Sequence, residues 1–262
     1  MEEKIIQYRS SSVFYRITGK GRPVILIHGF GEDGDIWQKQ VETLQQHFQL
    51  IIPDLPGSGR SALIPGADIE TYSEVIKAIL SEEQIKRCDM LGHSLGGYIT
   101  LSFAEKYPQL LSSFGLVHSS AFADSDEKKA ARRKSNEFIQ THGAYDFLRT
   151  AIPGLFGKEW SQDHQPEIDV LVEKGKGFTA EALVQYYQAM IARPDRTHVL
   201  KNFAGPILYI IGQYDNAVPF AQSMQQCYLP NRSYVHILRH SAHMGMWEEM
   251  AALNNFLLAF LQ

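Results

Sequence analysis

Residues 88–97 read CDMLGHSLGG, and this stretch decides how the chain folds. It contains Gly92-His93-Ser94-Leu95-Gly96, a G-x-S-x-G motif that follows an apolar run and precedes a helical pattern over 98–107. A serine on so tight a turn adopts a strained backbone conformation, and the residues two positions away must be nearly without side chains. Gly92 and Gly96 meet that demand. We therefore expect the Ser94 hydroxyl to be exposed to a base and a substrate, beside the positive N-terminus of the following helix.

The composition limits the function classes that the chain can belong to. The 262 residues, 44% of them hydrophobic, suffice for one large α/β domain or for one domain with an insertion. A net charge of -4 indicates no general affinity for nucleic acid or for an anionic membrane. The two cysteines, Cys88 and Cys227, provide neither a disulfide framework nor a metal cluster. The N-terminal residues lack the apolar region of a signal peptide, and no apolar run could span a bilayer. We expect a cytoplasmic protein with a small-molecule substrate.

Strand and helix patterns alternate on both sides of the motif. Period-2 alternation predicts two antiparallel strands within residues 3–18. A short all-apolar run predicts a strand buried on both faces at 23–27, and similar runs predict buried strands at 50–52 and 206–212. Further strands are predicted at 88–91, 114–117 and 234–238. Helical patterns lie between them, near 36–46, 69–84, 98–107 and 219–227, and a last helix ends the chain. This alternation predicts a mostly parallel sheet with right-handed crossovers.

The alternation is interrupted between residues 119 and 202. This region contains no buried strand pattern and has helical patterns at 126–142, 144–151, 165–175 and 179–192. We interpret residues 1–118 and 203–262 as an α/β core and residues 119–202 as a helical insertion. A run of positive charge, Lys128 to Lys134, lies in the insertion and could bind an acidic partner or substrate. Because acidic residues precede the run, we favour the solvated face of a helix.

A serine nucleophile needs a base, and the base needs a carboxylate that orients it. Asp215 follows the predicted strand at 206–212, at the edge where open α/β sheets meet ligands. His243 lies in the loop between the last strand and the last helix. Asp215 could instead only form a turn, and His240 is a second candidate for the base. We prefer His243 because it stands closer to the final helix. The resulting order Ser94, Asp215, His243 is that of one hydrolase class.

A tetrahedral oxyanion needs two backbone N–H donors. One is Leu95, directly after the serine, and the other is Phe30 in the loop His28-Gly29-Phe30-Gly31. We expect His28 to orient this loop by hydrogen bonds, and Phe30 also to form a wall of the pocket. Nucleotide binding is disfavoured because no G-x-G-x-x-G or Walker pattern is present. The loop from Asp54 to Ser61 is interpreted as a structural turn.

Taken together, these motifs resemble the α/β-hydrolase fold superfamily in its capped, single-domain bacterial type. The resemblance implies an eight-stranded, mostly parallel sheet with a helical cap between strands six and seven. It implies Ser94 as nucleophile, His243 as base and Asp215 as orienting acid, with no cofactor and no metal. Haloalkane dehalogenases and epoxide hydrolases of this fold have an aspartate where this chain has Ser94, so those reactions are disfavoured. The options that remain are carboxylesterase, lactonase, C–C bond hydrolase, thioesterase, cofactor-free haloperoxidase and the menaquinone-pathway synthase.

The leading hypothesis is a serine hydrolase that cleaves a carboxylic ester or related acyl substrate through an acyl-enzyme. The alternatives are a C–C bond hydrolase or an elimination synthase with the same triad, and a ligand-binding member without catalysis. The residues expected to contact substrate are Phe30, His28, Phe122, Tyr186 and Met190, with Phe147, Leu155 and Phe156 as further candidates in the insertion. An acid-binding synthase would need arginine or lysine in the pocket, and the insertion offers Arg132, Arg133, Arg149 and Arg193.

Overall fold

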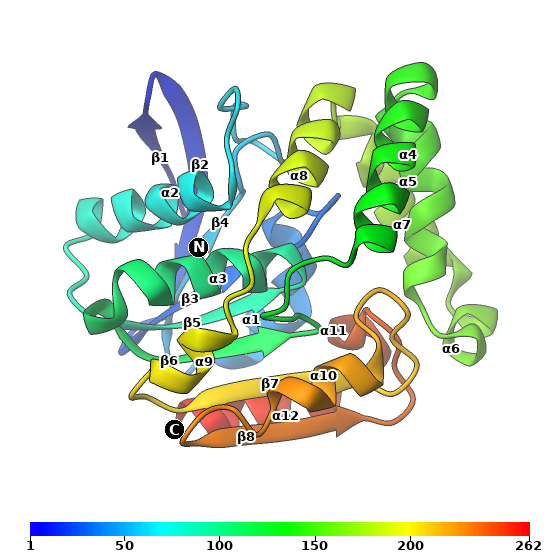
Figure 1. The fold of residues 1–262 in the computed structure, drawn as a ribbon. Coiled ribbons are helices and arrows are strands. Elements are labelled where there is room, and N and C mark those ends of the chain that lie inside the picture. Colours follow the sequence, from blue (N-terminus) through cyan, green and yellow to red (C-terminus); the bar gives the residue numbers. More distant parts are fainter.

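One eight-stranded sheet runs through the molecule, which we describe from a computed structural model covering all 262 residues (Figure 1). The strands lie in the order β1-β2-β4-β3-β5-β6-β7-β8. The first two strands are antiparallel to their neighbours, and β3 to β8 run parallel to one another. Their bounds are β1 Glu2–Tyr8, β2 Ser11–Thr18, β3 Pro23–Ile27, β4 Gln49–Pro53, β5 Cys88–His93, β6 Leu111–Val117, β7 Ile207–Gly212 and β8 Ser233–Leu238. The predicted eight-stranded, mostly parallel sheet is therefore confirmed.

The apolar runs explain the central position of β3, β5 and β7. Every residue of β5 and of β7 is buried, as is all of β3 beyond its first residue. A parallel strand covered by helices on both faces needs such a continuous apolar run. The edge strand β8 is exposed at most of its positions. Parallel pairing of Ile27 with Gly92 brings the end of β3 beside the end of β5, and so places the loop after β3 next to Ser94.

Helices cover both faces of the sheet. Helices α1 and α12 pack against each other on one face, and α2 and α3 pack against each other on the other (Figure 1). The side chain of Asp68 starts α2 by accepting a hydrogen bond from the Thr71 N–H at 2.7 Å. The helices outside the insertion are α1 Gln38–Leu44, α2 Ile69–Glu82, α3 Leu95–Lys106, α10 Phe220–Gln226, α11 Gly245–Glu248 and α12 Met250–Leu261, with 3₁₀ turns at Gly34–Trp37 and Pro108–Leu110.

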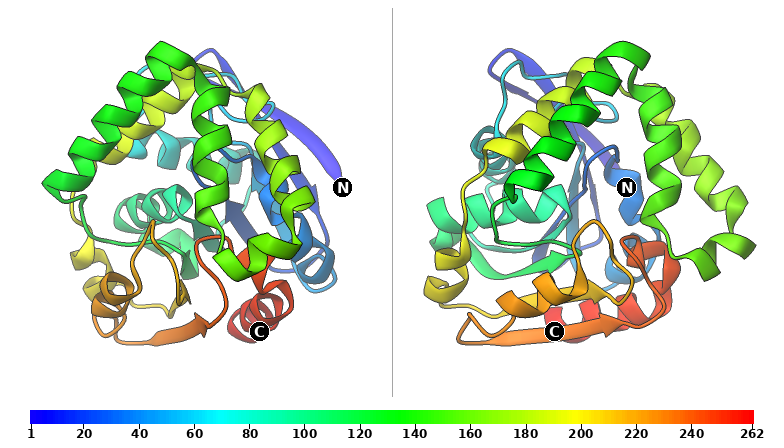
Figure 2. Two further views of the ribbon diagram at one scale, coloured as in Figure 1. Left: turned by 90° about the vertical axis from the view of Figure 1, so that its right-hand side faces the viewer. Right: turned by 45° about the vertical axis from the view of Figure 1, so that its right-hand side comes forward.

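Six helices lie between β6 and β7; α4 to α8 arch over one end of the sheet, whereas α9 packs against α3 (Figure 2). Four of them correspond to the helical patterns predicted from the sequence, whereas α6 and α9 were not predicted. They are α4 Asp126–His142, α5 Ala144–Ala151, α6 Lys158–Asp163, α7 Gln165–Lys174, α8 Ala180–Ala192 and α9 Thr197–Asn202, with 3₁₀ turns at Ile152–Leu155 and Gly175–Gly177. The boundaries of the insertion at residues 119 and 202 stay a prediction.

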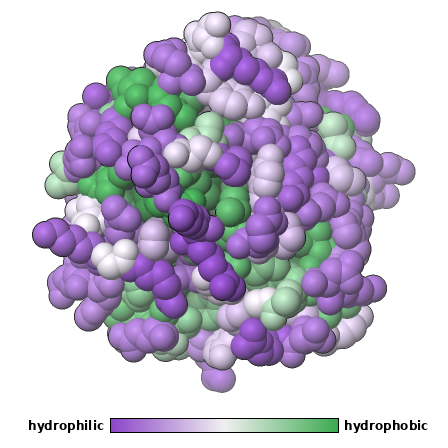
Figure 3. All heavy atoms as spheres, turned by 90° about the vertical axis from the view of Figure 1, so that its left-hand side faces the viewer, coloured by the Kyte–Doolittle hydropathy of each residue, from purple (hydrophilic) through white to green (hydrophobic).

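The hydrophobic core is continuous from the sheet into the insertion. A single cluster of 66 buried apolar residues includes Leu26 of β3 together with Ile139 of α4 and Leu183 of α8. The face on the α2 side of the molecule is largely hydrophilic, with apolar areas between the polar side chains (Figure 3). None of the helices combines the length and the hydropathy that a membrane span requires.

Candidate active site

Ser94 lies on a strained turn between β5 and α3. Its backbone has φ 51° and ψ -114°, a conformation that residues with a side chain rarely adopt. Three hydrogen bonds hold the turn: the Ser94 N–H donates to the Val117 carbonyl at 3.0 Å, and the Ser94 carbonyl accepts from the Gly97 N–H at 2.9 Å and from the Ser119 hydroxyl at 2.7 Å. The hydrogen bonds to Val117 and Ser119, at the end of β6, thus offset the backbone strain. Ser94 itself remains partly exposed.

The two glycines of the motif are required by close backbone contacts. A Cβ atom at Gly92 would lie 2.3 Å from the carbonyl carbon and oxygen of Gly96. A Cβ atom at Gly96 would lie 2.4 Å from the Ile27 carbonyl oxygen at the end of β3. Both distances are far shorter than any real carbon contact, so the turn exists only because these positions have no side chain.

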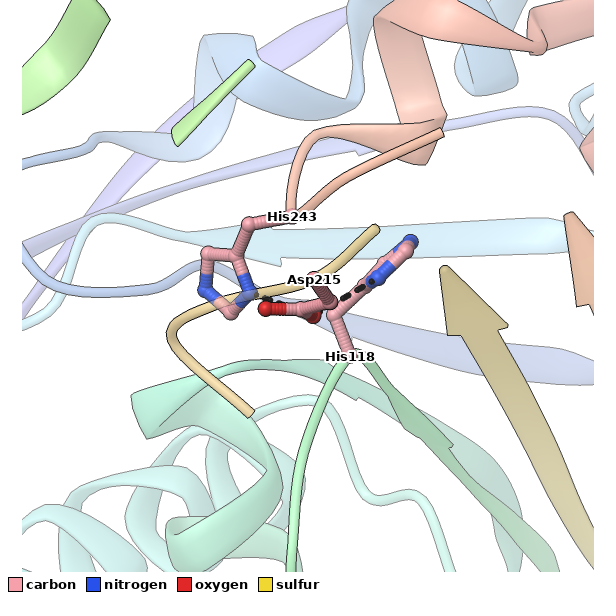
Figure 4. A group of neighbouring side chains, drawn as sticks. All are labelled: His118, Asp215 and His243. Carbon is pink, nitrogen blue, oxygen red and sulfur yellow. Dashed lines mark hydrogen bonds and ion pairs between the residues drawn. The ribbon is translucent and has the colours of Figure 1, made fainter. Parts of the chain in front are cut away.

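The structure brings Asp215 and His243 together (Figure 4). Asp215 follows β7 and His243 follows β8, and the His243 Nδ1 lies 2.8 Å from Asp215 Oδ2. The other carboxylate oxygen of Asp215 accepts the backbone N–H groups of Ala217 and Val218 at 2.9 and 2.8 Å. This pairing leaves the Nε2 of His243 as the nitrogen free for proton transfer. His240 is exposed, and its side chain makes no hydrogen bond to Asp215.

A second histidine, which sequence reasoning missed, shares the Asp215 carboxylate. His118 directly follows β6, and its Nδ1 lies 3.2 Å from Asp215 Oδ2 (Figure 4). Burial lowers the pKa of His118 to about 4 despite the neighbouring carboxylate, so the ring is neutral and donates its Nδ1–H. Burial alone would raise the pKa of Asp215, but attraction to His243 and the two imidazole hydrogen bonds hold it well below its usual range. Asp215 is therefore a carboxylate with every oxygen hydrogen-bonded.

These three side chains also form the group in the structure that could hold a metal ion, because their ligand atoms lie within 4.8 Å of one another. The orientation of the rings fits hydrogen bonding better. Both imidazoles direct Nδ1 at one oxygen of Asp215, as donors to a shared acceptor. The arrangement therefore fits a carboxylate that orients a catalytic base better than it fits a metal site.

The loop that carries His243 is fixed from three sides. The Glu248 carboxylate accepts the N–H groups of Ala242 and Met244, the residues on either side of His243, with shortest distances of 3.0 Å. The His243 N–H donates to the Leu155 carbonyl at 2.9 Å. Glu248 also accepts the N–H of Gly157 at 2.6 Å. Leu155 and Gly157 belong to the insertion, so the insertion itself positions the candidate base.

The loop after β3 lies directly against Ser94. A Cβ atom at Gly29 would lie 3.2 Å from the Ser94 Cβ, and the Phe30 N–H has no hydrogen-bond partner in the protein. Leu95 is the first residue of α3, so its N–H has no partner within the helix. Both predicted oxyanion donors, the N–H groups of Phe30 and Leu95, thus have no partner and lie close to the serine. Their role in binding an oxyanion stays a prediction.

A buried ion pair ties this loop to the serine turn. The Glu32 Oε2 accepts the Gly29 N–H at 2.6 Å and lies 3.0 Å from the His93 Nδ1. The other ring nitrogen of His93 lies 3.1 Å from the His243 carbonyl oxygen. Burial opposes both charges, but their mutual attraction lowers the pKa of Glu32 and raises that of His93. A protonated His93 donates from both nitrogens and so connects the three loops of the site.

Ser94 and His243 line one cavity of about 270 Å³ beneath the insertion, which we call the Ser94 cavity. No hydrogen bond joins the two residues in this structure; such bonds are often long before substrate binds. Phe30, Leu155 and Met190 line the cavity, and their contact with substrate stays a prediction. Tyr98 and Tyr187 line it as well, although neither was predicted, and the Tyr187 ring stacks on Phe30 with centroids 4.2 Å apart.

Of the eight residues expected to contact substrate or named as candidates for it, five lie outside the lining of this cavity, and the expectation is corrected for each: His28, Phe122, Tyr186, Phe147 and Phe156. His28 is completely buried, and its Nε2 accepts the Leu55 N–H at 2.9 Å, which fits the predicted role in orienting the loop. Tyr186 is also completely buried and donates its hydroxyl to the Pro56 carbonyl at 2.9 Å. Phe122 is not part of the lining; its carbonyl accepts from Arg193 at 3.1 Å.

The positive run in the insertion is only partly the solvated helix face that we favoured. Arg133 and Lys134 are exposed, but Lys128 and Arg132 line the Ser94 cavity. Residues four apart share one face of a helix, and α4 turns that face inward. Arg149 is exposed and pairs with Asp146, whereas Arg193 is buried against Asp124 at 2.9 Å.

Comparison with known proteins agrees with this geometry. Residues 22–141 match the family described as the alpha/beta hydrolase fold. The chain is 27% identical over 221 residues to a putative carbamate hydrolase RutD of Pantoea ananatis, covering 80% of this chain and 79% of that protein. It is 25% identical over 273 residues to a pimeloyl-[acyl-carrier protein] methyl ester esterase of Vibrio atlanticus, covering 97% of this chain and 99% of the relative.

Solved structures extend the likeness over the whole chain. A thermophilic esterase from Thermogutta terrifontis with bound malate is 26% identical, with a TM-score of 0.93 over 100% of this chain and 98% of that one. An enol-lactonase from Burkholderia xenovorans is 20% identical and shares the fold, with a TM-score of 0.91 over 98% of this chain and 99% of the other. The chain is therefore an enzyme with the α/β-hydrolase fold.

Proposed function

We propose that this protein is a serine hydrolase that cleaves a carboxylic ester through an acyl-enzyme on Ser94. The observation that carries the proposal is the 2.8 Å hydrogen bond between His243 and Asp215, with His243 and Ser94 facing one cavity. Relatives named as a methyl ester esterase and as a carbamate hydrolase support a hydrolase of this kind. Residues 119–202 then serve as a cap that encloses the substrate.

The first half of the reaction forms the acyl-enzyme. The Ser94 Oγ attacks the ester carbonyl carbon while the Nε2 of His243 takes the hydroxyl proton. The carbonyl oxygen becomes an oxyanion, which accepts hydrogen bonds from the N–H groups of Phe30 and Leu95. Asp215 holds His243 in the required tautomer and stabilises the imidazolium. The C–O bond to the alcohol then breaks, and His243 returns its proton to the leaving alkoxide.

The second half repeats these steps with water. His243 removes a proton from a water molecule, whose oxygen attacks the acyl carbon and forms a second oxyanion in the same place. Collapse of that intermediate releases the carboxylic acid, and the proton on His243 restores the Ser94 hydroxyl. His118 touches no reacting atom; it is a positioning residue that adds a second hydrogen bond to Asp215.

The test is labelling of the intact protein with a fluorophosphonate, combined with hydrolysis of short-chain p-nitrophenyl esters. We expect one covalent adduct on the wild type, none on Ser94→Ala, and ester hydrolysis lost in the same variant. Ser135→Ala is a matched control, because Ser135 lines the same cavity from α4 and takes no part in holding the Ser94 turn. An adduct that persists in Ser94→Ala, or undiminished hydrolysis by that variant, would contradict the proposal.

A further inference from the structure

The Ser94 cavity contains two cationic side chains that the reaction does not use. Lys128 and Arg132 line it together with Ser94 and His243, although both lie on α4 in the insertion. A cavity for a neutral ester would have no need of them, because desolvating a cation without a partner costs free energy.

Arg132 is held by one end only. Its Nε donates to Asp124 Oδ2 at 2.7 Å, and its guanidinium lies 5.3 Å from the centroid of the Tyr187 ring at the cavity wall. The two terminal nitrogens have no acceptor in the protein, and the side chain is 14% exposed. A guanidinium fixed in this way presents two parallel N–H groups, which is the geometry that binds a carboxylate with two hydrogen bonds.

Lys128 lies one helical turn before Arg132 and is also partly engaged. Its Nζ donates to the Ala217 carbonyl at 2.7 Å, and Ala217 lines the same cavity. An ammonium group has three N–H donors, so two remain for a ligand. Lys128 and Arg132 can thus reach one anion from neighbouring turns of α4.

The protein does not neutralise the charge at this end of the cavity. Asp124 is the carboxylate that pairs with Arg132, and it is shared with the buried Arg193 at 2.9 Å. Lys128, Arg132 and Arg193 carry three positive charges against the single charge of Asp124. Asp124 itself is not part of the cavity lining, and the acidic residue that is, Glu32, is already paired with His93.

The environment of Tyr98 shows the same excess of positive charge. Its ring lines the cavity, and the Arg193 guanidinium lies 3.8 Å from the ring centroid. Burial would raise the pKa of Tyr98, but Arg193, Lys128 and Arg132 together lower it below its ordinary value. A positive potential that favours a phenolate also favours any other anion in this place.

We propose that the ester substrate carries a carboxylate, which Lys128 and Arg132 bind while Ser94 attacks the ester carbonyl. The inference rests on the proposed function, since it names the substrate class of the same site. The carboxylate belongs either to the acyl part, as in a hemiester of a dicarboxylic acid, or to the alcohol part, as in an acylated hydroxy acid. Both sources present the same group to α4.

The test compares matched pairs of esters that differ only in charge. For the acyl part the pair is monomethyl glutarate and methyl 4-carbamoylbutanoate, and for the alcohol part it is acetoxyacetate and acetoxyacetamide. We expect kcat/KM for the anion to exceed that for its neutral amide by about ten- to a hundredfold in one pair, the range of a charge-assisted hydrogen bond. The pair that shows the preference identifies which part carries the carboxylate.

Variants locate the preference in the structure. Arg132→Gln and Lys128→Gln should each reduce the ratio of anionic to neutral kcat/KM, mainly through KM. Arg133→Gln, an exposed neighbour on the same helix, should leave the ratio as in the wild type. The Ser94→Ala variant allows binding to be measured without turnover. In titration calorimetry it should bind glutarate, and the double variant with Arg132→Gln should not.

The outcomes separate the two proposals. Hydrolysis of the neutral esters with no preference for either anion, together with no binding of glutarate, would overturn the carboxylate site and leave the serine hydrolase intact. Absence of hydrolysis and of fluorophosphonate labelling would overturn the proposed function. The carboxylate site would then be judged by the calorimetric titration of Ser94→Ala with glutarate, in which binding supports the site and absence of binding overturns it. A preference that survives both glutamine variants would show that other residues carry it.

Discussion

Replacing Glu32 by glutamine should destabilise the protein in a way that depends on pH. The change keeps the shape of the side chain but removes its charge. Glu32 Oε2 serves two buried donors, the Gly29 N–H at 2.6 Å and the His93 Nδ1 at 3.0 Å. The amide oxygen of glutamine can still accept both hydrogen bonds, but it carries no negative charge to balance a buried, protonated His93.

The size of the destabilisation follows from the buried positive charge of His93, which the variant leaves without a partner. Breaking a buried ion pair costs about 3–5 kcal/mol, and loss of the His93 proton would relieve part of this cost. We expect Glu32→Gln to lower the free energy of unfolding by about 2–4 kcal/mol where the pair is fully charged.

The stabilisation from the Glu32–His93 pair is lost both in acid and in alkaline solution, for a different reason in each. The pKa of Glu32 is lowered by folding, so its contribution is present above 4.5 and is lost as the pH falls. The pKa of His93 is raised by folding, so its contribution is complete below 6.5 and is lost as the pH rises through the folded value. The difference between wild type and variant should therefore be largest between pH 4.5 and 6.5 and should shrink in alkaline solution.

Urea unfolding followed by circular dichroism, in the acidic window and in alkaline buffer, measures this difference. Glu42→Gln is the control, because Glu42 is exposed and makes no ion pair. A loss below about 0.5 kcal/mol, the usual scatter of surface substitutions, would refute the reasoning. So would a loss of equal size at both pH values, because the charge on His93 would then play no part.

Three further predictions concern neighbouring parts of the site. Asp215→Asn should lower kcat for ester hydrolysis by about four orders of magnitude, since His243 loses the acceptor that fixes its tautomer; stopped-flow or steady-state assays measure this. Tyr186→Phe should cost about 1–2 kcal/mol in urea unfolding with little change in kcat, whereas Tyr187→Phe, at the cavity wall, should change KM more than stability. Burial would raise the pKa of Asp124, but its two arginine partners lower it from 3.8 to about 2. Asp124→Asn should therefore lose about 2–3 kcal/mol at neutral pH, and the gap to the wild type should close as acid unfolding is followed down towards pH 2.

The parts of the fold that sequence predicts best are those with local causes. The apolar runs identified the buried strands, and the two glycines around Ser94 identified the turn, because each pattern reflects one short segment. Helix α4 was predicted with its observed bounds, Asp126–His142. The short helices α6 and α9 were missed, since six residues make too little periodic pattern to recognise.

The orientation of side chains in the insertion was harder to predict. Tyr186 and Tyr187 differ by one position, which is a rotation of about 100° on a helix, and only packing decides which one meets the cavity. The same holds for Arg132 and Arg133 on α4. His118 could have been found, because it directly follows β6, the neighbour of the strand that leads to Asp215, and the carboxyl ends of neighbouring parallel strands meet at one edge.

The hydrogen bonds from the His243 loop to Leu155 and Gly157 have a consequence for protein engineering. Enzymes with caps are often treated as modular, with the insertion exchanged to obtain a new specificity while the core supplies the chemistry. Here Leu155, the last residue of the 3₁₀ turn, and Gly157, two residues further on, belong to the scaffold of the base as much as to the cap. A chimera that takes its insertion from a relative should therefore keep residues 155–157 of the host chain, and the exchange should begin and end on either side of them.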